Sequence, residues 1–125
     1  MGKRTLLRTR QVVVRHLAAK LEGCESTLIN DLDYVCGVLN DVTEKIGMTC
    51  LGRSIHRFAP HGVSVVFLLA ESHISVHTWP ECGLADIEIV SCNPHSDVRL
   101  GLRIVEAAFK ASATTSRTWT FKHDY

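Results

Sequence analysis

The chain has 125 residues, of which 46% are hydrophobic and 22% charged, and its 14 Lys and Arg against 13 Asp and Glu leave a formal net charge of +1. This length and composition predict one globular domain, residues 1–125, with a hydrophobic core of its own. A net charge so close to zero argues against a dedicated nucleic-acid-binding protein, which is typically strongly basic. The longest apolar stretch, Val63 to Ala70, is too short to span a bilayer. We therefore expect neither nucleic acid nor a membrane as a partner.

The five cysteines are widely spaced and form no C-x-x-C pair: Cys24, Cys36, Cys50, Cys82 and Cys92. An odd count without metal-type spacing favours neither a secreted disulfide framework nor a zinc ribbon. The apolar run within residues 1–10 is two leucines long, which is too short for a secretory signal. The expectation is a cytoplasmic protein without a bound metal, and the basic segment of residues 3–10 is assigned no function.

The first half of the chain predicts a strand followed by a helix. Residues 11–20 begin with β-branched side chains, which are typical of a strand. Residues 26–46 repeat apolar side chains at the i, i+3, i+4 spacing of an amphipathic helix. Gly47 is a suitable stop for this helix, because glycine readily adopts the left-handed conformation that follows many helices.

The second half predicts further strands and one more helix. Four segments have the alternation or the β-branched composition of strands: 49–58, 63–70, 73–78 and 84–92. A helix is predicted directly after Asn93-Pro94, because asparagine caps helices well and proline fits a first turn. Residues 113–121 form a last strand. The fold class is α+β: a two-layer α/β sandwich in which an antiparallel sheet has two helices packed on one face.

Reactive side chains are concentrated between His56 and Cys92. On a strand, Ser75, His77 and Trp79 point to one face while the residues between them point to the other. A histidine and an indole ring can therefore line one cleft.

The residue types alone indicate a reactive centre near Ser72, His77 and Cys92 without defining its chemistry, because a lone strand histidine or cysteine is most often structural. Ser72 or Ser75 paired with His77 would make a nucleophile and its base. The sequence has no Gly-x-Ser-x-Gly elbow, which disfavours that class of hydrolase. A zinc site is also disfavoured, because His73 and His77 would lie about 13 Å apart along a strand.

Two stretches of this region form a longer pattern: Ile55-His-Arg-Phe-Ala-Pro-His-Gly-Val-Ser64, and Ala70-Glu-Ser-His-Ile-Ser-Val-His-Thr-Trp-Pro-Glu81 with Cys92 eleven residues further on. Their order and spacing closely resemble the short prokaryotic, pyruvoyl-dependent type of S-adenosylmethionine decarboxylase proenzyme, and the similarity covers most of the chain. The resemblance implies self-cleavage between Glu71 and Ser72 into a β chain, residues 1–71, and an α chain, residues 72–125. Ser72 would become a covalent pyruvoyl cofactor, which forms a Schiff base with the substrate amine and accepts the electrons released with CO₂.

The resemblance also implies a role for each matching residue. His77 matches the base in processing, and Ser64 matches a residue that assists processing. Cys92 matches the proton donor to the decarboxylated carbon, which has a further part in processing. Two aromatic residues that stack on adenine and a carboxylate that binds ribose are matched by Phe58, Trp79 and Glu81. The family forms its site between protomers, which implies a homodimer of αβ units. The product, decarboxylated S-adenosylmethionine, would serve as aminopropyl donor in spermidine and polyamine biosynthesis.

Two departures from the family pattern keep alternatives open. Asp86 is an additional acid, and Glu88 replaces an aspartate. An extra carboxylate in the pocket favours a substrate with a second cationic amine, so a pyruvoyl-dependent L-ornithine or L-arginine decarboxylase is one alternative. Phe58, Trp79 and Glu81 favour S-adenosylmethionine instead, because a linear amino acid has no adenine or ribose. An unprocessed, non-catalytic partner of an active paralogue is the other alternative.

Overall fold

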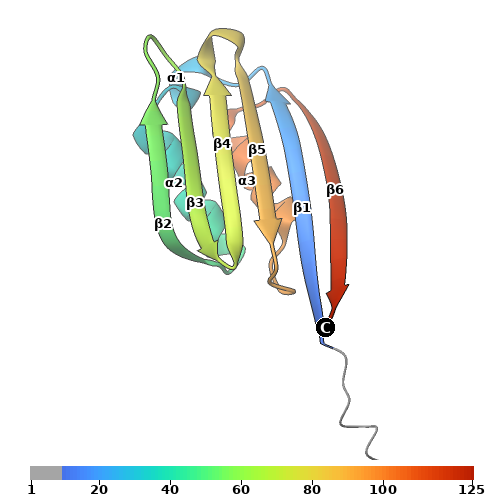
Figure 1. Ribbon diagram of the computed structural model, residues 1–125. Coiled ribbons are helices and arrows are strands. Elements are labelled where there is room, and N and C mark those ends of the chain that lie inside the picture. The colour runs from blue at the N-terminus through green and yellow to red at the C-terminus, as the bar shows by residue number, and fades with distance from the viewer. Residues whose placement is uncertain (1–9) are drawn as a thin grey trace, which may run out of the picture.

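A computed structural model describes residues 10–125 as a six-stranded antiparallel sheet with its helices on one face (Figure 1). The elements are β1 (Gln11–Glu22), α1 (Ser26–Ile29), α2 (Leu32–Lys45), β2 (Thr49–Arg57), β3 (Val63–Ala70), β4 (Ser72–Trp79), the 3-10 helix η2 (Pro80–Cys82), β5 (Leu84–Ser91), α3 (Val98–Phe109) and β6 (Ala113–Asp124). The strand order is β2-β3-β4-β5-β1-β6. The predicted two-layer sandwich is confirmed, whereas the basic segment, apart from Arg10, lies outside the described residues.

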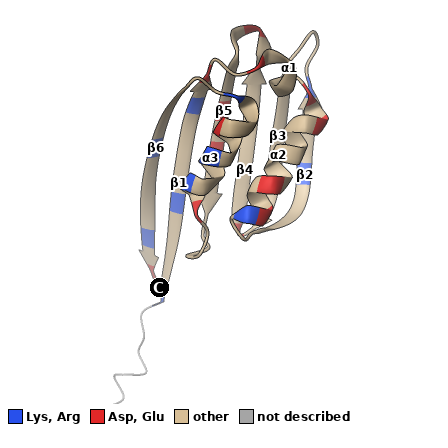
Figure 2. Cartoon of the chain, turned by 180° about the vertical axis from the view of Figure 1, so that it is seen from behind, with Lys and Arg blue, Asp and Glu red and all other residues tan. Residues whose placement is uncertain are grey.

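The alternation of apolar residues along the strands decides which face of the sheet is buried. On β3 the inward side chains are all at most 2% exposed: Val63, Val65, Phe67 and Leu69. The apolar stripes of α2 and α3 cover this face, with Leu39, Val42, Val105 and Phe109 buried against it. A fully buried side chain of this size contributes roughly 1.5–3 kcal/mol. Acidic and basic residues are interspersed along the two helices on the side away from the sheet (Figure 2).

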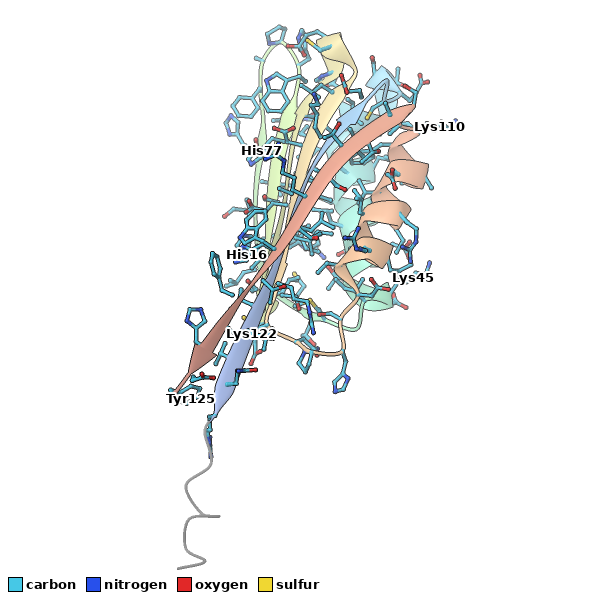
Figure 3. All side chains as sticks on the ribbon, turned by 90° about the vertical axis from the view of Figure 1, so that its right-hand side faces the viewer. His16, Lys45, His77, Lys110, Lys122 and Tyr125 are labelled. Carbon is cyan, nitrogen blue, oxygen red and sulfur yellow. The ribbon has the colours of Figure 1, made fainter. Side chains whose placement is uncertain are left out.

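Across residues 10–125, no helix covers the other face of the sheet. Seen along its edge, the sheet has α2 and α3 on one side, with Lys45 and Lys110, and His16 and His77 on the other (Figure 3). The strand register places one row of residues across all six strands on this uncovered face: His56, Ser64, His77, Asp86, Lys20 and Thr115. Two of the reactive residues on the central strands, Ser64 and His77, therefore face away from the core, whereas Ser72 pairs with Ser91, which is fully buried.

The single helix predicted over 26–46 is wrong, because the chain turns between α1 and α2. The side-chain oxygen of Asn30 accepts a hydrogen bond from the Gly62 amide at 2.8 Å. Asp31 then caps α2 by accepting from the Tyr34 amide at 3.0 Å. Short polar side chains of this kind replace helical hydrogen bonds with local or tertiary ones. Gly47, with a φ of 74°, follows α2 as predicted.

The second helix also starts later than the sequence predicts. The side chain of Asn93 accepts from the His95 amide at 2.9 Å, which holds this segment in a turn rather than at a helix start. Asp97 is the N-cap of α3, and its carboxylate accepts from the Leu100 amide at 3.1 Å. The predicted start after Asn93-Pro94 is therefore wrong, and β6 extends beyond its predicted end to Asp124.

Candidate active site

One group of predicted residues meets where the β2–β3 and β4–β5 connections lie side by side. A cavity of about 430 Å³, which we call the aromatic pocket, is lined by Phe58, His61, Ser64, His77, Thr78, Trp79 and Glu81. Phe58 and Trp79 are 48% and 40% exposed, so both rings are free to contact a ligand. The pocket thus combines two aromatic rings, one carboxylate and a histidine.

His77 is paired with Ser64 within this pocket. The two residues lie directly opposite each other on β4 and β3, and Ser64 Oγ is 2.7 Å from His77 Nδ1. The serine that contacts His77 is therefore Ser64, whereas the residue types alone indicated Ser72 or Ser75. In the tautomer in which Nδ1–H donates to the hydroxyl, Nε2 is free to accept a proton.

The α1 segment holds both connections that form the pocket walls. The Gly62 amide donates to Asn30 Oδ1 at 2.8 Å, and the Phe58 amide donates to the Gly62 carbonyl at 2.8 Å. The hydroxyl of Ser26 donates to the Pro80 carbonyl in η2, also at 2.8 Å. Because these bonds fix the backbone on either side of the cavity, the spacing of the walls depends on α1.

A second group of predicted residues lies at the opposite end of the sheet. Ser72 begins β4 with a φ of 123°, a conformation that residues with a side chain rarely adopt. The Cys92 amide donates a hydrogen bond of 3.3 Å to the Glu71 carbonyl oxygen. A donor in this position stabilises negative charge that develops on that oxygen.

Hydrogen bonds also fix the segment that carries Cys92. The Asn93 amide donates to Ser91 Oγ at 3.0 Å, and Ser91 Oγ is in short contact with Ser96 Oγ. From β1, the guanidinium of Arg15 donates to the Asn93 carbonyl at 3.2 Å. Cys92 is therefore held beside Glu71 by hydrogen bonds within its own segment and by one from β1.

The two groups do not meet within one chain. Ser72 pairs with Ser91 in the sheet register, whereas His77 pairs with Asp86. Five residues of strand separate Ser72 from His77, which corresponds to about 16 Å. The single centre of Ser72, His77 and Cys92 that the residue types indicated is thus not formed by one chain, and it is divided between the two ends of the sheet.

A second, larger cavity adjoins His77 on the uncovered face. Its volume is about 750 Å³, and its lining includes both acids and bases: Lys20, Ser75, His77, Asp86, Glu88, Thr115, Arg117 and Trp119. We call it the charged cavity. Asp86 lies opposite both His77 and Lys20 in the register, and Glu88 Oε1 is 3.3 Å from His73 Nε2. The additional carboxylate of Asp86 therefore faces the same side of the sheet as the aromatic pocket, next to a cation.

His61 is a pocket residue to which the sequence analysis assigned no role. Its Nε2 lies 3.1 Å from Glu81 Oε1. Its position three residues after Phe58 was the one indication in the sequence that it lies near the pocket. Its contact with Glu81 could not be predicted, because it joins two separate connections of the chain.

Other features of the described region concern metals, membranes and thiols. Within residues 10–125, no three His, Cys, Asp or Glu side chains are grouped to hold a metal ion, and no helix is long and apolar enough to cross a membrane. Burial raises the pKa of the Cys24 and Cys36 thiols. These two cysteines pack with the core, unlike Cys92.

Comparison with solved structures defines the class of protein first. An adenosylmethionine decarboxylase from Aquifex aeolicus matches with a TM-score of 0.80 and 27% sequence identity, over 88% of this chain and 91% of that one. The fold is thus shared with a small decarboxylase.

Sequence comparison then defines the family. A profile described as S-adenosylmethionine decarboxylase matches residues 15–120. The S-adenosylmethionine decarboxylase proenzyme of Archaeoglobus fulgidus is 37% identical over 99 residues, covering 79% of this chain and 88% of the relative. Proenzyme 2 of Halalkalibacterium halodurans is 36% identical over 100 residues, covering 80% and 79%. The chain belongs to the S-adenosylmethionine decarboxylase family.

Proposed function

We propose that the chain is a self-processing decarboxylase of S-adenosylmethionine that acts in the cytoplasm and supplies decarboxylated S-adenosylmethionine for polyamine biosynthesis. The observation that carries this proposal is the aromatic pocket. Phe58 and Trp79 offer exposed rings to an adenine and to the adjacent sulfonium cation. Glu81, in the same cavity, can accept hydrogen bonds from ribose hydroxyls. A linear amino acid would leave both rings without a partner.

Self-cleavage would begin with attack of Ser72 Oγ on the Glu71 carbonyl carbon, an acyl shift that moves Glu71 from the nitrogen to the oxygen of residue 72 as an ester. Loss of the α-proton of residue 72 then releases Glu71 as the carboxyl end of the β chain, residues 1–71. The dehydroalanine that remains on the α chain, residues 72–125, takes up water and releases ammonia to become the pyruvoyl group. The surroundings of Ser72 support this step. When Ser72 Oγ attacks the Glu71 carbonyl carbon, negative charge develops on an oxygen that already accepts from the Cys92 amide at 3.3 Å. The pyruvoyl group, once formed, supplies an electron sink for the bond that breaks as CO₂ leaves.

The remaining residues move protons around this group. His77 accepts the α-proton of residue 72 during processing through Nε2, while Ser64 holds Nδ1 at 2.7 Å. Ser64 also stabilises the cyclic intermediate of the acyl shift. The Cys92 thiol donates a proton to the carbon from which CO₂ departs. Ser72 and Cys92 lie at one end of the sheet, and Ser64 and His77 lie at the other. The reaction therefore requires the two ends to be brought together.

A homodimer brings the two ends together. Two chains related by a two-fold axis can place their uncovered faces together, so that the end of the sheet with Ser72 and Cys92 in one chain lies near the end with Ser64 and His77 in the other. The uncovered face carries the exposed apolar side chain of Leu68, which is 56% exposed. Apolar side chains on an uncovered sheet face are typical of a subunit interface.

The direct test is intact-protein mass spectrometry of the purified protein, followed by measurement of CO₂ release from S-adenosylmethionine, ornithine and arginine in parallel. We expect two fragments, residues 1–71 and a blocked chain beginning at residue 72, and CO₂ from S-adenosylmethionine. Ser72→Ala should remain one chain of 13.9 kDa. Cleavage of that variant at the same bond would rule out Ser72 as the nucleophile.

A second candidate function is supported by the position of Asp86. Its carboxylate lines the charged cavity beside His77 and suits a second amine, as in ornithine or arginine. Lys20 and Arg117 line the same cavity and offset this negative charge, which favours S-adenosylmethionine. Release of CO₂ from ornithine or arginine, and not from S-adenosylmethionine, would favour this second function over the first. A chain that stays uncut would instead support a non-catalytic partner of an active paralogue.

A further inference from the structure

His61 joins the two connections that form the aromatic pocket. It belongs to the β2–β3 connection, whereas Glu81 belongs to η2, and the two side chains meet with His61 Nε2 3.1 Å from Glu81 Oε1. Both side chains are partly accessible, at 37% and 45%. Among the described residues, Glu81 has no other ion-pair partner within 4.0 Å. The contact engages Oε1 of a carboxylate whose residue also lines the aromatic pocket.

We propose that His61 is a positioning residue, which holds the Glu81 carboxylate for recognition of the 2′- and 3′-hydroxyls of a ribose. This inference rests on the proposed function, in which Glu81 binds the ribose of S-adenosylmethionine. A free glutamate loses side-chain entropy when a ligand immobilises it. A carboxylate already held by the imidazole has lost part of this freedom before the ligand arrives, so it binds a diol more tightly.

The connection that carries His61 is fixed, so the imidazole is held in place. Gly62 donates to Asn30 Oδ1 at 2.8 Å and accepts from the Phe58 amide at 2.8 Å. Gly62 has a φ of 104°, and a Cβ atom there would lie 3.0 Å from the Thr78 carbonyl oxygen. Because this turn packs closely on β4, the backbone that carries His61 cannot shift away from Glu81.

The turn that carries Glu81 is fixed in the same way. Ser26 Oγ donates to the Pro80 carbonyl at 2.8 Å, and the Gly83 amide donates to that carbonyl at 3.1 Å. The Cys24 amide in turn donates to the Gly83 carbonyl at 2.9 Å. With both backbones restrained, the remaining freedom of Glu81 lies in its side chain, which is the part that His61 contacts.

The test compares a ribonucleoside with an analogue that lacks both hydroxyls. Binding of 5′-methylthioadenosine and of its 2′,3′-dideoxy analogue is measured by calorimetry on processed wild type, His61→Ala, His61→Gln and Glu81→Gln. We expect wild type to prefer the ribonucleoside, and His61→Ala to lose about three- to tenfold of that preference while its affinity for the dideoxy analogue stays unchanged. His61→Gln keeps an N–H donor and should retain part of the preference. For S-adenosylmethionine, His61→Ala should raise KM and leave kcat unchanged.

The two ligands separate positioning from general support of the pocket. If His61→Ala weakens both ligands equally, or leaves the preference of wild type intact, His61 does not position Glu81 and the inference is wrong. If wild type binds neither nucleoside, the proposed function and this inference fall together. Mass spectrometry of each variant shows whether the chain is cut. A loss of affinity or activity that is caused by failed self-cleavage is identified in this way.

Discussion

Two groups of Cys92, its amide and its thiol, have a role in the proposed reaction at the end of the sheet that carries Ser72. Its amide donates to the Glu71 carbonyl at 3.3 Å, and its thiol is assigned proton donation after CO₂ loss. Cys92→Ala retains the amide and removes the thiol, so it separates the two roles. We expect self-cleavage to continue more slowly, because the family match gives the thiol a further part in processing, and turnover to fall by about 10²-fold or more, the scale of a missing proton donor.

Time courses of intact mass and of CO₂ release measure the two effects of Cys92→Ala separately. Cys36→Ala is a matched control, because Cys36 lies on α2 and packs against the core. It should be cut and turn over as wild type does. Full activity of Cys92→Ala would remove the thiol from the mechanism.

Trp79 allows a second prediction for a single residue. Trp79→Leu should weaken nucleoside binding, because ring stacking contributes about 0.5–1.5 kcal/mol beyond area burial. Titration with 5′-methylthioadenosine measures the change in Kd. Tyr125→Leu is the control, since Tyr125 is also an exposed aromatic residue, at 70%, and lines neither the aromatic pocket nor the charged cavity. An unchanged Kd for Trp79→Leu would exclude the stacking role.

Among the elements, α1 supports the pocket although it contributes no lining residue. Asn30→Ala removes the acceptor for the Gly62 amide and should destabilise the fold by about 1–3 kcal/mol, because that amide is left without a partner. The aromatic walls lose their spacing, so KM for S-adenosylmethionine rises, whereas self-cleavage at the other end continues. Denaturant unfolding and steady-state kinetics measure both. Asn40→Ala, on the helix side, should leave KM unchanged, and an equal KM for the two variants would refute the role of α1.

The elements also show what the sequence can and cannot predict. Periodicity was sufficient for the strands and for the buried faces of α2 and α3, because burial on one side imposes it. It failed at Asn30, because the hydrogen-bond partner of that side chain is Gly62, 32 residues away. The local turn at Asn93 was missed for a similar reason, since its side chain bonds the His95 amide instead of capping a helix.

The candidate site was predictable to a similar degree. The motif identified five of the residues that line the aromatic pocket: Phe58, Ser64, His77, Trp79 and Glu81. The pairing of Ser64 with His77 depends on strand register, however, and a slip of one residue would turn every side chain to the other face. The separation of Ser72 from His77 was contained in the sequence, since five strand residues span about 16 Å. The His61–Glu81 contact could not be predicted from the sequence, because it joins two connections that only the folded chain brings together.

At the scale of the whole molecule, the uncovered face of the sheet determines how the chain can function. One chain has the aromatic pocket at one end and Ser72 at the other, and its core is completed on the helix side alone. Sheets that pack face to face lie about 10 Å apart, which allows side chains of both chains to share one site. The charged cavity would then be enclosed between the chains, with Lys20 and Arg117 close to Asp86 and Glu88.

A shared site predicts complementation between two inactive chains. Ser72→Ala keeps the aromatic pocket and lacks the pyruvoyl precursor, whereas His77→Ala keeps Ser72 and lacks the processing base. When both variants are co-expressed with different affinity tags, half of the randomly formed dimers are mixed, and each mixed dimer has one intact site. We therefore expect about one quarter of wild-type CO₂ release, well above either variant alone.

The control for complementation uses two changes at the same end of the sheet. Co-expressed Ser72→Ala and Cys92→Ala leave every mixed dimer with a defect in both sites, so they should restore nothing. Purification through both tags raises the expected activity of the first pair to about half of wild type, because only mixed dimers remain. If Ser72→Ala and His77→Ala stay inactive after that purification, each site is built from a single chain, and β4 would have to rearrange to bring Ser72 to His77. If both pairs of variants recover equal activity, that activity does not come from a site shared between the two chains.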